Sequence, residues 1–374
     1  MVILHNYSIW LPQTQTWMYQ QVRHMPPSFE NHVVCETTDN LDQFEVPNIH
    51  SLDKKPGAFW DRALRDIRVR NHLQFLVDVA LEQKASLLHS HFGHTGWANL
   101  GAARLANLKH VVTFYGLDVN YLPRKWPWKT RYRQLFREVD RVLCEGPFMA
   151  RAIEALGCPE EKIKVHHLGV ELSSIPFQPR HWDGKGPLKV LLAASFREKK
   201  GIPYALEALA RIQGDVEITL IGDANAQHQQ EKRRILEVIE KNRLNVRLMG
   251  YQPYRVLFEE CYRHHLFLSP SVTAKDGDTE GGAPVSLIEM SASGMPVVST
   301  THCDIPEVIK HGESGLLAPE RDVEGLAKHL QTLIEHPERW EAMGRAGRAH
   351  VEKEYDARFQ GQRLGAIYDA LMDS

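Results

Sequence analysis

Short apolar runs alternate with longer helix-period segments along almost the whole chain, and this alternation restricts the possible folds more than any other feature. Consecutive parallel strands need a crossover between them, so the pattern predicts parallel sheets with helices on both faces. In the first half the expected strands are residues 2–5, 32–35, 86–91, 110–114, 141–144 and 163–166. In the second half they are residues 188–193, 216–221, 246–249, 266–268, 297–299 and 315–317. We therefore expect an α/β protein with two doubly wound sheets.

A polar stretch with proline and glycine, FQPRHWDGKGP, separates the two series of strands. It contains little that could pack, so we expect a linker at residues 177–187 between Rossmann-like domains at residues 1–180 and 181–374. The last helical segment, residues 355–372, could pack back on the first domain. Domains of this kind bind ligands outside the C-terminal ends of their strands, and two of them facing each other form a cleft.

The charge balance and the cysteines argue against several classes of protein. The formal net charge of −2 gives no global attraction for nucleic acid. The five cysteines form no CxxC pair, so we expect free thiols in a reducing compartment and no zinc site. No basic leader with an apolar core is found, and no run of about eighteen apolar residues occurs. These observations predict a cytoplasmic protein without a membrane span, for which peripheral membrane attachment stays open.

The stretch at residues 278–298, DTEGGAPVSLIEMSASGMPVV, predicts a loop followed by a helix. Pro284 suits the first helical position, and a glycine and a proline further on end the helix. Glu280 and the glycine pair after it then lie in the loop, whereas Glu289 lies inside the helix. Because a helix start offers free N–H groups and a positive dipole end, and glycines allow close approach, this arrangement suits a diphosphate.

A second strand-to-helix turn, SFREKKGIPYALEALA, follows the strand expected at residues 188–193. Gly201 and Pro203 mark the start of its helix, and Arg197, Lys199 and Lys200 precede it. A glutamate in an amphipathic helix or a lysine pair is usually solvated surface, so each residue alone says little. One cationic and one acidic turn of this kind in a single domain together indicate an anionic, hydroxyl-rich ligand.

These motifs resemble those of the family 4 glycosyltransferases, retaining enzymes of the GT-B fold that transfer a sugar from a nucleotide-sugar donor. In the second half the resemblance covers both turns, LIGDA, VRLMGY and STTHCDIPEVIKHGESGLLAPERDVEGLA. In the first half it covers LLHSHFG, VVTFYGLDV and ALGCPEEKIKVHHLGVEL. It implies two Rossmann-like domains facing a central cleft, with the acceptor on the first domain and the donor on the second.

The resemblance also implies roles for residues on the donor side. Glu289 corresponds to the glutamate that binds the donor ribose, and Glu280 to the glutamate that meets the transferred sugar, with a spacing one residue longer than usual. Lys200 corresponds to the phosphate-binding lysine, and Arg197 stands in for the usual arginine. Glu280, Arg197 and Lys200 are thus candidate catalytic residues. The residues expected to face the sugar and diphosphate are Gly281, Gly282, Ala283, Pro284 and Val285.

On the acceptor side the candidates are a histidine, a turn and a loop. His91 is a candidate catalytic residue, although a histidine at the end of a buried strand is as readily a core residue with satisfied hydrogen bonds. Tyr115 and Asp118 of the FYGLD segment are expected to line the cleft. The glycine-rich loop of the family is replaced here by LPQTQTW, in which hydrogen bonds could come from Thr14, Gln15 and Thr16.

The predicted activity is transfer of a hexose, with retention, from a nucleoside-diphosphate sugar to a saccharide or lipid-linked saccharide acceptor in cell-surface polysaccharide synthesis. A nucleotide-sugar epimerase or hydrolase with the same cleft stays open as an alternative. The sequence contains no GxGxxG motif after a strand and no P-loop. Asp276-Gly-Asp278 matches a metal-binding D-x-D pattern, but helix dipoles and Lys200 already supply positive charge. We therefore expect no cofactor and no metal.

The segment at residues 121–141, YLPRKWPWKTRYRQLFREVDR, contains seven Lys/Arg against two acidic residues. Its apolar residues fall on one helical face, so the segment could simply pack on the sheet. The alternative is that its basic end, which carries Trp126 and Trp128, touches an anionic membrane.

Overall fold

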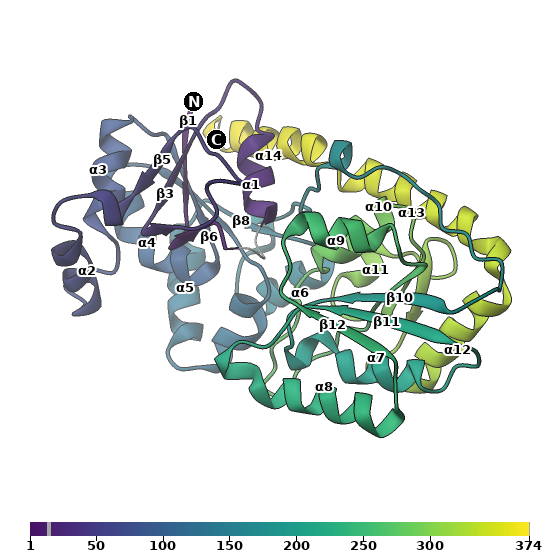
Figure 1. The fold of residues 1–374 in the computed structure, drawn as a ribbon. Helices are drawn as coiled ribbons and strands as arrows, with labels where there is room; N and C mark the ends of the chain where they lie inside the picture. Colours follow the sequence, from purple (N-terminus) through teal and green to yellow (C-terminus); the bar gives the residue numbers. More distant parts are fainter. Residues whose placement is uncertain (13–15, 374) are drawn as a thin grey trace. The chain divides into compact units, whose positions relative to one another are not determined.

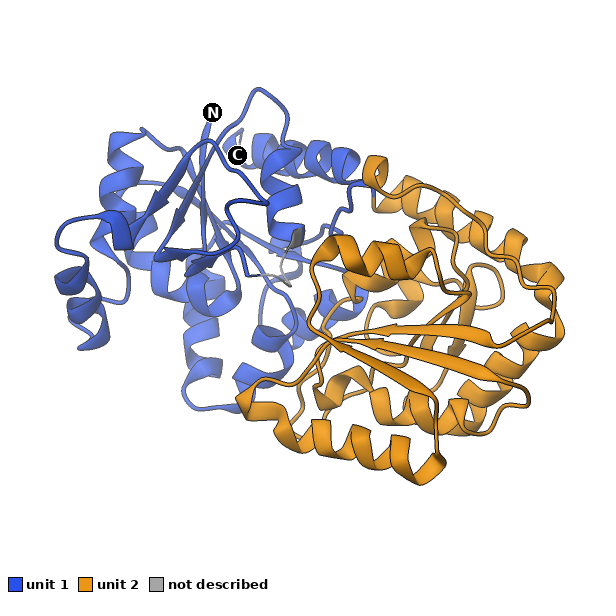
Figure 2. Ribbon diagram, viewed as in Figure 1, with its two compact units in different colours: residues 1–171, 356–374 blue, residues 172–355 orange. Residues whose placement is uncertain are grey.

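The computed structural model describes residues 1–12 and 16–373 and contains two α/β units. Unit 1 comprises Met1–Glu171 and Asp356–Ser374, and unit 2 comprises Leu172–Tyr355 (Figure 2). Each unit has its own parallel sheet flanked by helices (Figure 1). The α/β class and the two sheets predicted from the alternating pattern are therefore confirmed.

The sheet of unit 1 has seven parallel strands in the order β5-β3-β1-β6-β7-β8-β9. All six strands expected from apolar runs are present. Sequence analysis missed β5 and the short β2-β4 pair, because two or three residues are too few to form a recognisable run. The strands are β1 (Val2–Asn6), β2 (Ile9–Trp10), β3 (Glu30–Cys35), β4 (Thr37–Thr38), β5 (Ile49–Ser51), β6 (Leu87–His91), β7 (Lys109–Thr113), β8 (Arg141–Cys144) and β9 (Ile163–Val165).

The helices of unit 1 come from both ends of the chain. They are α1 (Thr16–Arg23), α2 (Ala58–Asp66), α3 (Gln74–Glu82), α4 (Gly93–Leu105), α5 (Trp128–Glu138), α6 (Pro147–Ala155) and the C-terminal α14 (Ala357–Met372). The hydroxyl group of Tyr368 in α14 lies 2.6 Å from His89 Nδ1 in the core. Gly361 lets α14 approach α1 so closely that a Cβ atom there would lie 2.0 Å from the His24 carbonyl oxygen. The last helix therefore packs on the first unit, as the sequence allowed.

The sheet of unit 2 has six parallel strands in the order β12-β11-β10-β13-β14-β15, all of them predicted. These are β10 (Leu188–Ala193), β11 (Val216–Ile221), β12 (Val246–Gly250), β13 (Leu266–Ser269), β14 (Val297–Thr300) and β15 (Gly315–Ala318). The helices are α7 (Ile202–Leu209), α8 (Gln229–Asn242), α9 (Tyr254–Cys261), α10 (Val285–Ala292), α11 (Ile305–Val308), α12 (Val323–Glu335) and α13 (Trp340–Glu354).

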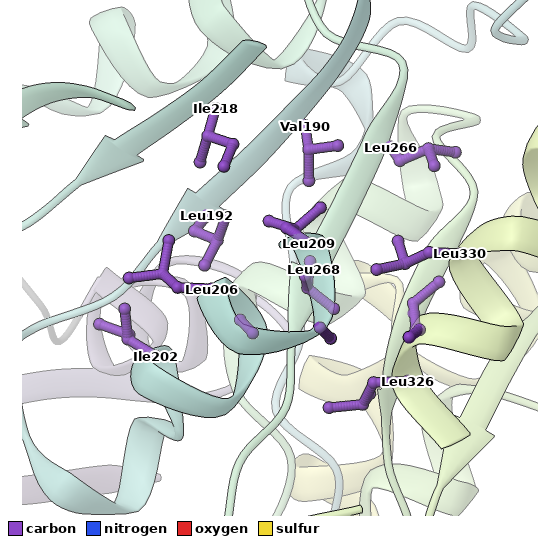
Figure 3. Close-up of a cluster of buried hydrophobic side chains, with 14 of the residues drawn as sticks. Val190, Leu192, Ile202, Leu206, Leu209, Ile218, Leu266, Leu268, Leu326 and Leu330 are labelled. Carbon is purple, nitrogen blue, oxygen red and sulfur yellow. The ribbon is translucent and has the colours of Figure 1, made fainter. Parts of the chain in front are cut away.

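An aliphatic core fixes the sheet of unit 2 against α7 and α12. The side chains of these strands and helices interdigitate with almost no exposed surface (Figure 3). Such a core holds the strand ends, and the loops that leave them, in fixed positions. The labelled members are Val190, Leu192, Ile202, Leu206, Leu209, Ile218, Leu266, Leu268, Leu326 and Leu330.

The predicted domain boundary at residues 180 and 181 is wrong. Unit 2 begins at Leu172, and its last residue is Tyr355 rather than residue 374. The stretch expected to be a free linker is anchored, because Arg180 is 6% exposed and donates to the carbonyl oxygens of Cys261 and His264. Trp182 stacks on Trp340 with 6.1 Å between the ring centroids. One buried arginine and one stacked tryptophan thus fix a segment whose composition looks unpacked.

The described helices include none with both the length and the apolar character needed to cross a bilayer.

Candidate functional site

The candidate site of unit 2 lies where the strand order reverses direction. Strand β10 has β11 on one side and β13 on the other, so the chain winds outward in both directions from this point. In such sheets ligands bind at the C-terminal ends of the two strands beside the reversal. The loops after β10 and β13 are the two turns that the sequence singled out. They touch at Gly201, which has a φ of +62° and where a Cβ atom would lie 1.9 Å from the Pro270 carbonyl oxygen.

Glu280 is held by groups from both loops. Lys200 Nζ donates to Glu280 Oε2 at 2.9 Å, and Ser271 Oγ donates to Oε1 at 2.8 Å. Lys199 Nζ lies 3.8 Å from the same Oε2. Burial alone would raise the pKa of Glu280, but the charges of Lys200 and Lys199 outweigh it and hold that pKa at about 2. Lys200 and Glu280, each predicted from the sequence as a site residue, therefore form an ion pair in the structure.

Asp278 forms salt bridges with two of the three cationic residues in the loop after β10. Arg197 donates to its Oδ2 at 2.5 Å, and Lys199 Nζ lies 3.4 Å from its Oδ1. Lys199 also donates to the carbonyl oxygen of Thr279 at 2.7 Å and is 7% exposed. Arg197 and Lys199 thus fasten one loop to the other. Among these three cations, Lys200 is the one bound to Glu280 by a hydrogen bond.

A buried histidine braces the backbone of the acidic loop. The Glu280 N–H group donates to His302 Nε2 at 3.1 Å, so the ring proton lies on Nδ1, which donates to Glu320 Oε1 at 2.6 Å. Glu320 also accepts from the Thr273 N–H group at 2.7 Å. Burial would raise the pKa of Glu320, but the hydrogen bonds from His302 and Thr273 hold it at about 2. Loops after β13, β14 and β15 are joined in this way.

The glycine-rich loop leads into α10 at the same edge of the sheet. Gly281 and Gly282 are buried, whereas Ala283, Pro284 and Val285 are half-buried. Pro284 takes the N-cap position, one residue before its predicted place at the first position of the helix. The helix start, with its free N–H groups, therefore follows the acidic loop directly at this edge.

Glu289 lies in α10 in an environment opposite to that of Glu280. It is 4% exposed, and its Oε1 accepts a hydrogen bond of 2.6 Å from the hydroxyl group of Tyr254. Burial raises the pKa of Glu289 to about 7, because a phenol hydrogen bond lowers it far less than two ammonium groups would. This glutamate therefore titrates near neutral pH.

In unit 1, His91 belongs to a fully buried network of histidines. Its Nδ1 lies 2.7 Å from the hydroxyl group of Tyr115, and its Nε2 lies 3.3 Å from His5 Nδ1. Burial lowers the pKa of His91 well below its usual value. With a side chain that is 0% exposed, His91 matches the core alternative rather than the predicted catalytic residue. Tyr115 is 8% exposed and serves this network.

The histidines of this network lie close enough together to resemble a metal site. Ring nitrogens of His5, His89 and His91 lie within 4.8 Å of one another. Hydrogen bonds already engage these rings, since His89 contacts Tyr368 and Thr113 at 2.6 Å each and His5 Nε2 contacts Asn31 Oδ1 at 3.2 Å. The cluster is thus a neutral hydrogen-bond network that joins strands of unit 1.

Asp118 is a structural residue, which corrects the prediction that it lines a cleft. Its carboxylate is 0% exposed and accepts from the N–H groups of Gly93 at 2.6 Å and Tyr115 at 2.9 Å. It therefore fastens the FYGLD turn to the start of α4. Thr14 and Gln15 lie outside the described residues, and Thr16 is the first residue of α1.

Several residues of the site in unit 2 were missed by sequence reasoning. They follow strand ends, as the predicted residues do, and parallel strands bring all their C-terminal ends to one edge. Reading every polar residue within a few positions of a strand end would have found most of them. They are Ser271 after β13, His302 after β14 and Glu320 after β15. Tyr254 also fits this rule, because it is the first residue of α9 and stands four positions after the end of β12.

Comparisons with known proteins agree with this geometry. A family model described as Glycosyltransferase Family 4 matches residues 14–174, and one described as Glycosyl transferases group 1 matches residues 187–336. The amylovoran biosynthesis glycosyltransferase AmsK of Erwinia amylovora is 34% identical over 294 residues, which cover 77% of this chain and 70% of that protein. The chain belongs to glycosyltransferase family 4.

This family 4 glycosyltransferase is also similar to other proteins in sequence or in fold. The putative colanic acid biosynthesis glycosyltransferase WcaL of Escherichia coli K12 is 32% identical over 308 residues, or 78% of this chain and 72% of that one. The crystal structure of Anabaena Alr3699/HepE in complex with UDP and glucose superimposes with a TM-score of 0.80 at 17% identity, over 99% of this chain and 100% of that one. The latter likeness concerns the fold and confirms the GT-B class. The matched families and these relatives give the epimerase or hydrolase alternative no support.

The histidine brace generates a test of the site. Replacing His302 with alanine is expected to raise the KM of the enzyme for its sugar donor about tenfold, because one or two buried hydrogen bonds that hold the acidic loop are lost. Steady-state kinetics below the melting temperature of each variant would measure this. His302→Gln, whose amide oxygen can still accept from Glu280 N–H, should fall between the two. His336→Ala, at a side chain 52% exposed, is the control. An unchanged KM in His302→Ala would show that the brace does not position the loop.

Proposed function

We propose that this enzyme is a retaining hexosyltransferase that moves a sugar from a nucleoside-diphosphate sugar to a saccharide or lipid-linked saccharide during synthesis of a cell-surface polysaccharide. The observation that carries the proposal is the contact of 2.9 Å between Lys200 and Glu280 at the strand-order reversal of unit 2. It joins a cation for phosphate and a carboxylate for sugar hydroxyl groups at one point. Relatives named for the synthesis of amylovoran and colanic acid support the choice of product class.

In this proposal Lys200 binds the diphosphate, and Lys199 stays beside the acidic residues. When a donor binds, Lys200 turns from Glu280 to the diphosphate, and the starts of α7 and α10 add their N–H groups. Lys199 stays on Asp278 and near Glu280, so the buried carboxylate keeps a counter-charge while it accepts from a sugar hydroxyl group. Arg197 remains on the loop and can add charge at its exposed side. Negative charge that develops on the leaving diphosphate is thereby stabilised, and no side chain needs to act as a nucleophile.

A nucleotide panel tests the donor site. Among UDP, GDP, ADP, CDP and their sugars, one diphosphate is expected to raise the melting temperature, since a ligand at about a hundred times its Kd adds about 2.7 kcal/mol. UDP deserves inclusion because Alr3699/HepE was solved with it. Lys200→Ala should weaken the diphosphate more than the nucleoside, and Glu289→Ala should weaken both by about 1.5 to 3 kcal/mol. If no nucleotide shifts the melting temperature, the donor-site assignment fails.

The pKa of Glu289 predicts a pH dependence for donor binding. A carboxylic acid with a pKa of about 7 is mostly protonated below that pH and ionised above it. Because the ionised form accepts two hydroxyl groups, affinity for a nucleotide sugar should rise about tenfold from about pH 6 to about pH 8. Isothermal titration calorimetry would measure this affinity. A nucleotide sugar is the better ligand, because it has no terminal phosphate whose own protonation changes in this pH range. Glu289→Gln should show a flat profile, and a wild-type profile equally flat would contradict the proposed role.

We further propose that transfer requires no metal ion. The D-x-D pattern supports this, because Asp278 is bound to Arg197 and Lys199, and Asp276 Oδ1 accepts from the Asp278 N–H group at 2.9 Å. A cation would have to displace these contacts. Transfer after exhaustive treatment with EDTA should equal transfer with added Mg²⁺ or Mn²⁺. Activity lost with EDTA and restored by either ion would reverse the assignment.

The acceptor class places the enzyme at a membrane surface in this proposal. A lipid-linked saccharide is held at a bilayer, so an enzyme that uses it works as a peripheral protein on the cytoplasmic face. The packing alternative for residues 121–141 is confirmed for most of the helical segment, since Tyr132, Leu135 and Phe136 are buried. Trp126, however, is 92% exposed.

A further inference from the structure

Helix α2 of unit 1 exposes its large apolar side chains. Phe59 and Trp60 are 71% and 70% exposed and form an edge-to-face pair with 5.4 Å between their ring centroids. Ile67 and Val69, which follow the helix, are 70% and 68% exposed. No residue of α2 is buried, and Figure 1 shows the helix at the outer margin of unit 1. We name these four residues the α2 patch.

The opposite side of α2 is attached to unit 1 mainly by charged groups, with Ala58 packed against the core. Arg62 and Arg65 both pair with Glu36, at 3.4 and 2.5 Å. Asp61 accepts from the N–H groups of Gln74 and Phe75 at 2.8 Å each, which caps α3. A surface helix normally turns its apolar stripe toward the core. Here polar groups hold the helix in place. Its large apolar side chains therefore remain exposed and can contact something other than the core of unit 1.

The segment around the α2 patch is basic in a chain whose net charge is −2. Residues 53–70 contain six Lys/Arg against three aspartates. Lys54, which precedes the helix, and Arg68, which follows it, are both exposed. Exposed apolar and aromatic side chains, with cations at both ends of the helix that are not paired with a described residue, form a composition that binds the interface of an anionic bilayer.

The basic end of α5 adjoins this segment. The guanidinium group of Arg131 lies over the rings of Trp97 and Trp128, at 4.2 and 4.8 Å from their centroids. Arg70 at the end of this segment lines one hollow together with Trp97 of α4 and Gln134 of α5. Trp126 precedes this helix and is almost fully exposed. The surface with cations and tryptophan thus continues from α2 toward α5.

We propose that the α2 patch, with Lys54, Arg68 and the exposed Trp126, is the surface by which the enzyme docks on an anionic lipid bilayer. Four apolar side chains enter the interface while the cations meet lipid phosphates. The docking surface deepens the proposed membrane contact and rests on that part of the proposed function alone. A second copy of the chain fits less well, because it would bring the same cations together.

Vesicle flotation tests the docking surface. The full chain should float with vesicles that contain about one-third phosphatidylglycerol, and much less with pure phosphatidylcholine or at about 0.5 M salt. Phe59→Ser with Trp60→Ser should lower binding to anionic vesicles at least about tenfold. Lys54→Glu with Arg68→Glu should do the same at low salt. Melting curves and nucleotide-induced shifts of both variants should match the wild type, which separates this test from the donor site.

The control variant is Leu81→Ser with Leu105→Ser, two leucines of unit 1 that are 60% and 63% exposed outside the α2 patch. It should bind vesicles like the wild type. Equal losses in the control and patch variants, or equal flotation with neutral and anionic vesicles, would overturn the proposal. So would a concentration-dependent dimer that Phe59→Ser with Trp60→Ser abolishes while vesicle binding stays unchanged, since the patch would then be an interface between copies.

Discussion

The contact between the loops that follow β10 and β13 is the constraint on which the donor side depends. The loops meet where strand order reverses, so closely that Gly201 has no room for a side chain. This closeness brings Lys199 and Lys200 against Asp278 and Glu280. Because the carboxylates are buried, removing either partner of a salt bridge would leave an uncompensated charge away from water, which is costly. The site is therefore organised before any ligand arrives.

Two glutamates in one short stretch show that the groups in contact with a carboxyl group, and not the residue type, set its protonation state. Both Glu280 and Glu289 are buried, which alone raises the pKa of a carboxyl group. Ammonium groups reverse the shift at Glu280, while the single phenol at Glu289 does not. One glutamate is thus a permanent anion, and the other changes charge near neutral pH.

The two units use polar residues in different ways. Unit 2 collects charged groups at one edge of its sheet, where a ligand can exchange with them. Unit 1 fills its core with neutral histidines, among them His5, His89 and His91, whose hydrogen bonds reach Tyr115 and Tyr368. In unit 1 the exposed feature is α2, which salt bridges attach to the unit while its large apolar side chains face the solvent. Buried polar networks of this type specify a unique core because every nitrogen needs a partner.

The sequence by itself determined the alternation of strands and helices, because burial on both faces of a parallel sheet leaves continuous apolar runs that are easy to recognise. It also determined the two turns with Lys200, Glu280 and Glu289, since glycine and proline mark helix starts locally. Only the tertiary structure decided which buried polar residues meet at the candidate site. His302 and Glu320 join the site, whereas Asp118 and His91 satisfy partners inside unit 1. The boundary at Leu172 likewise depends on Arg180 and Trp182 finding distant partners. Pairings between residues far apart in the chain leave no periodic trace, so no local pattern could have predicted them.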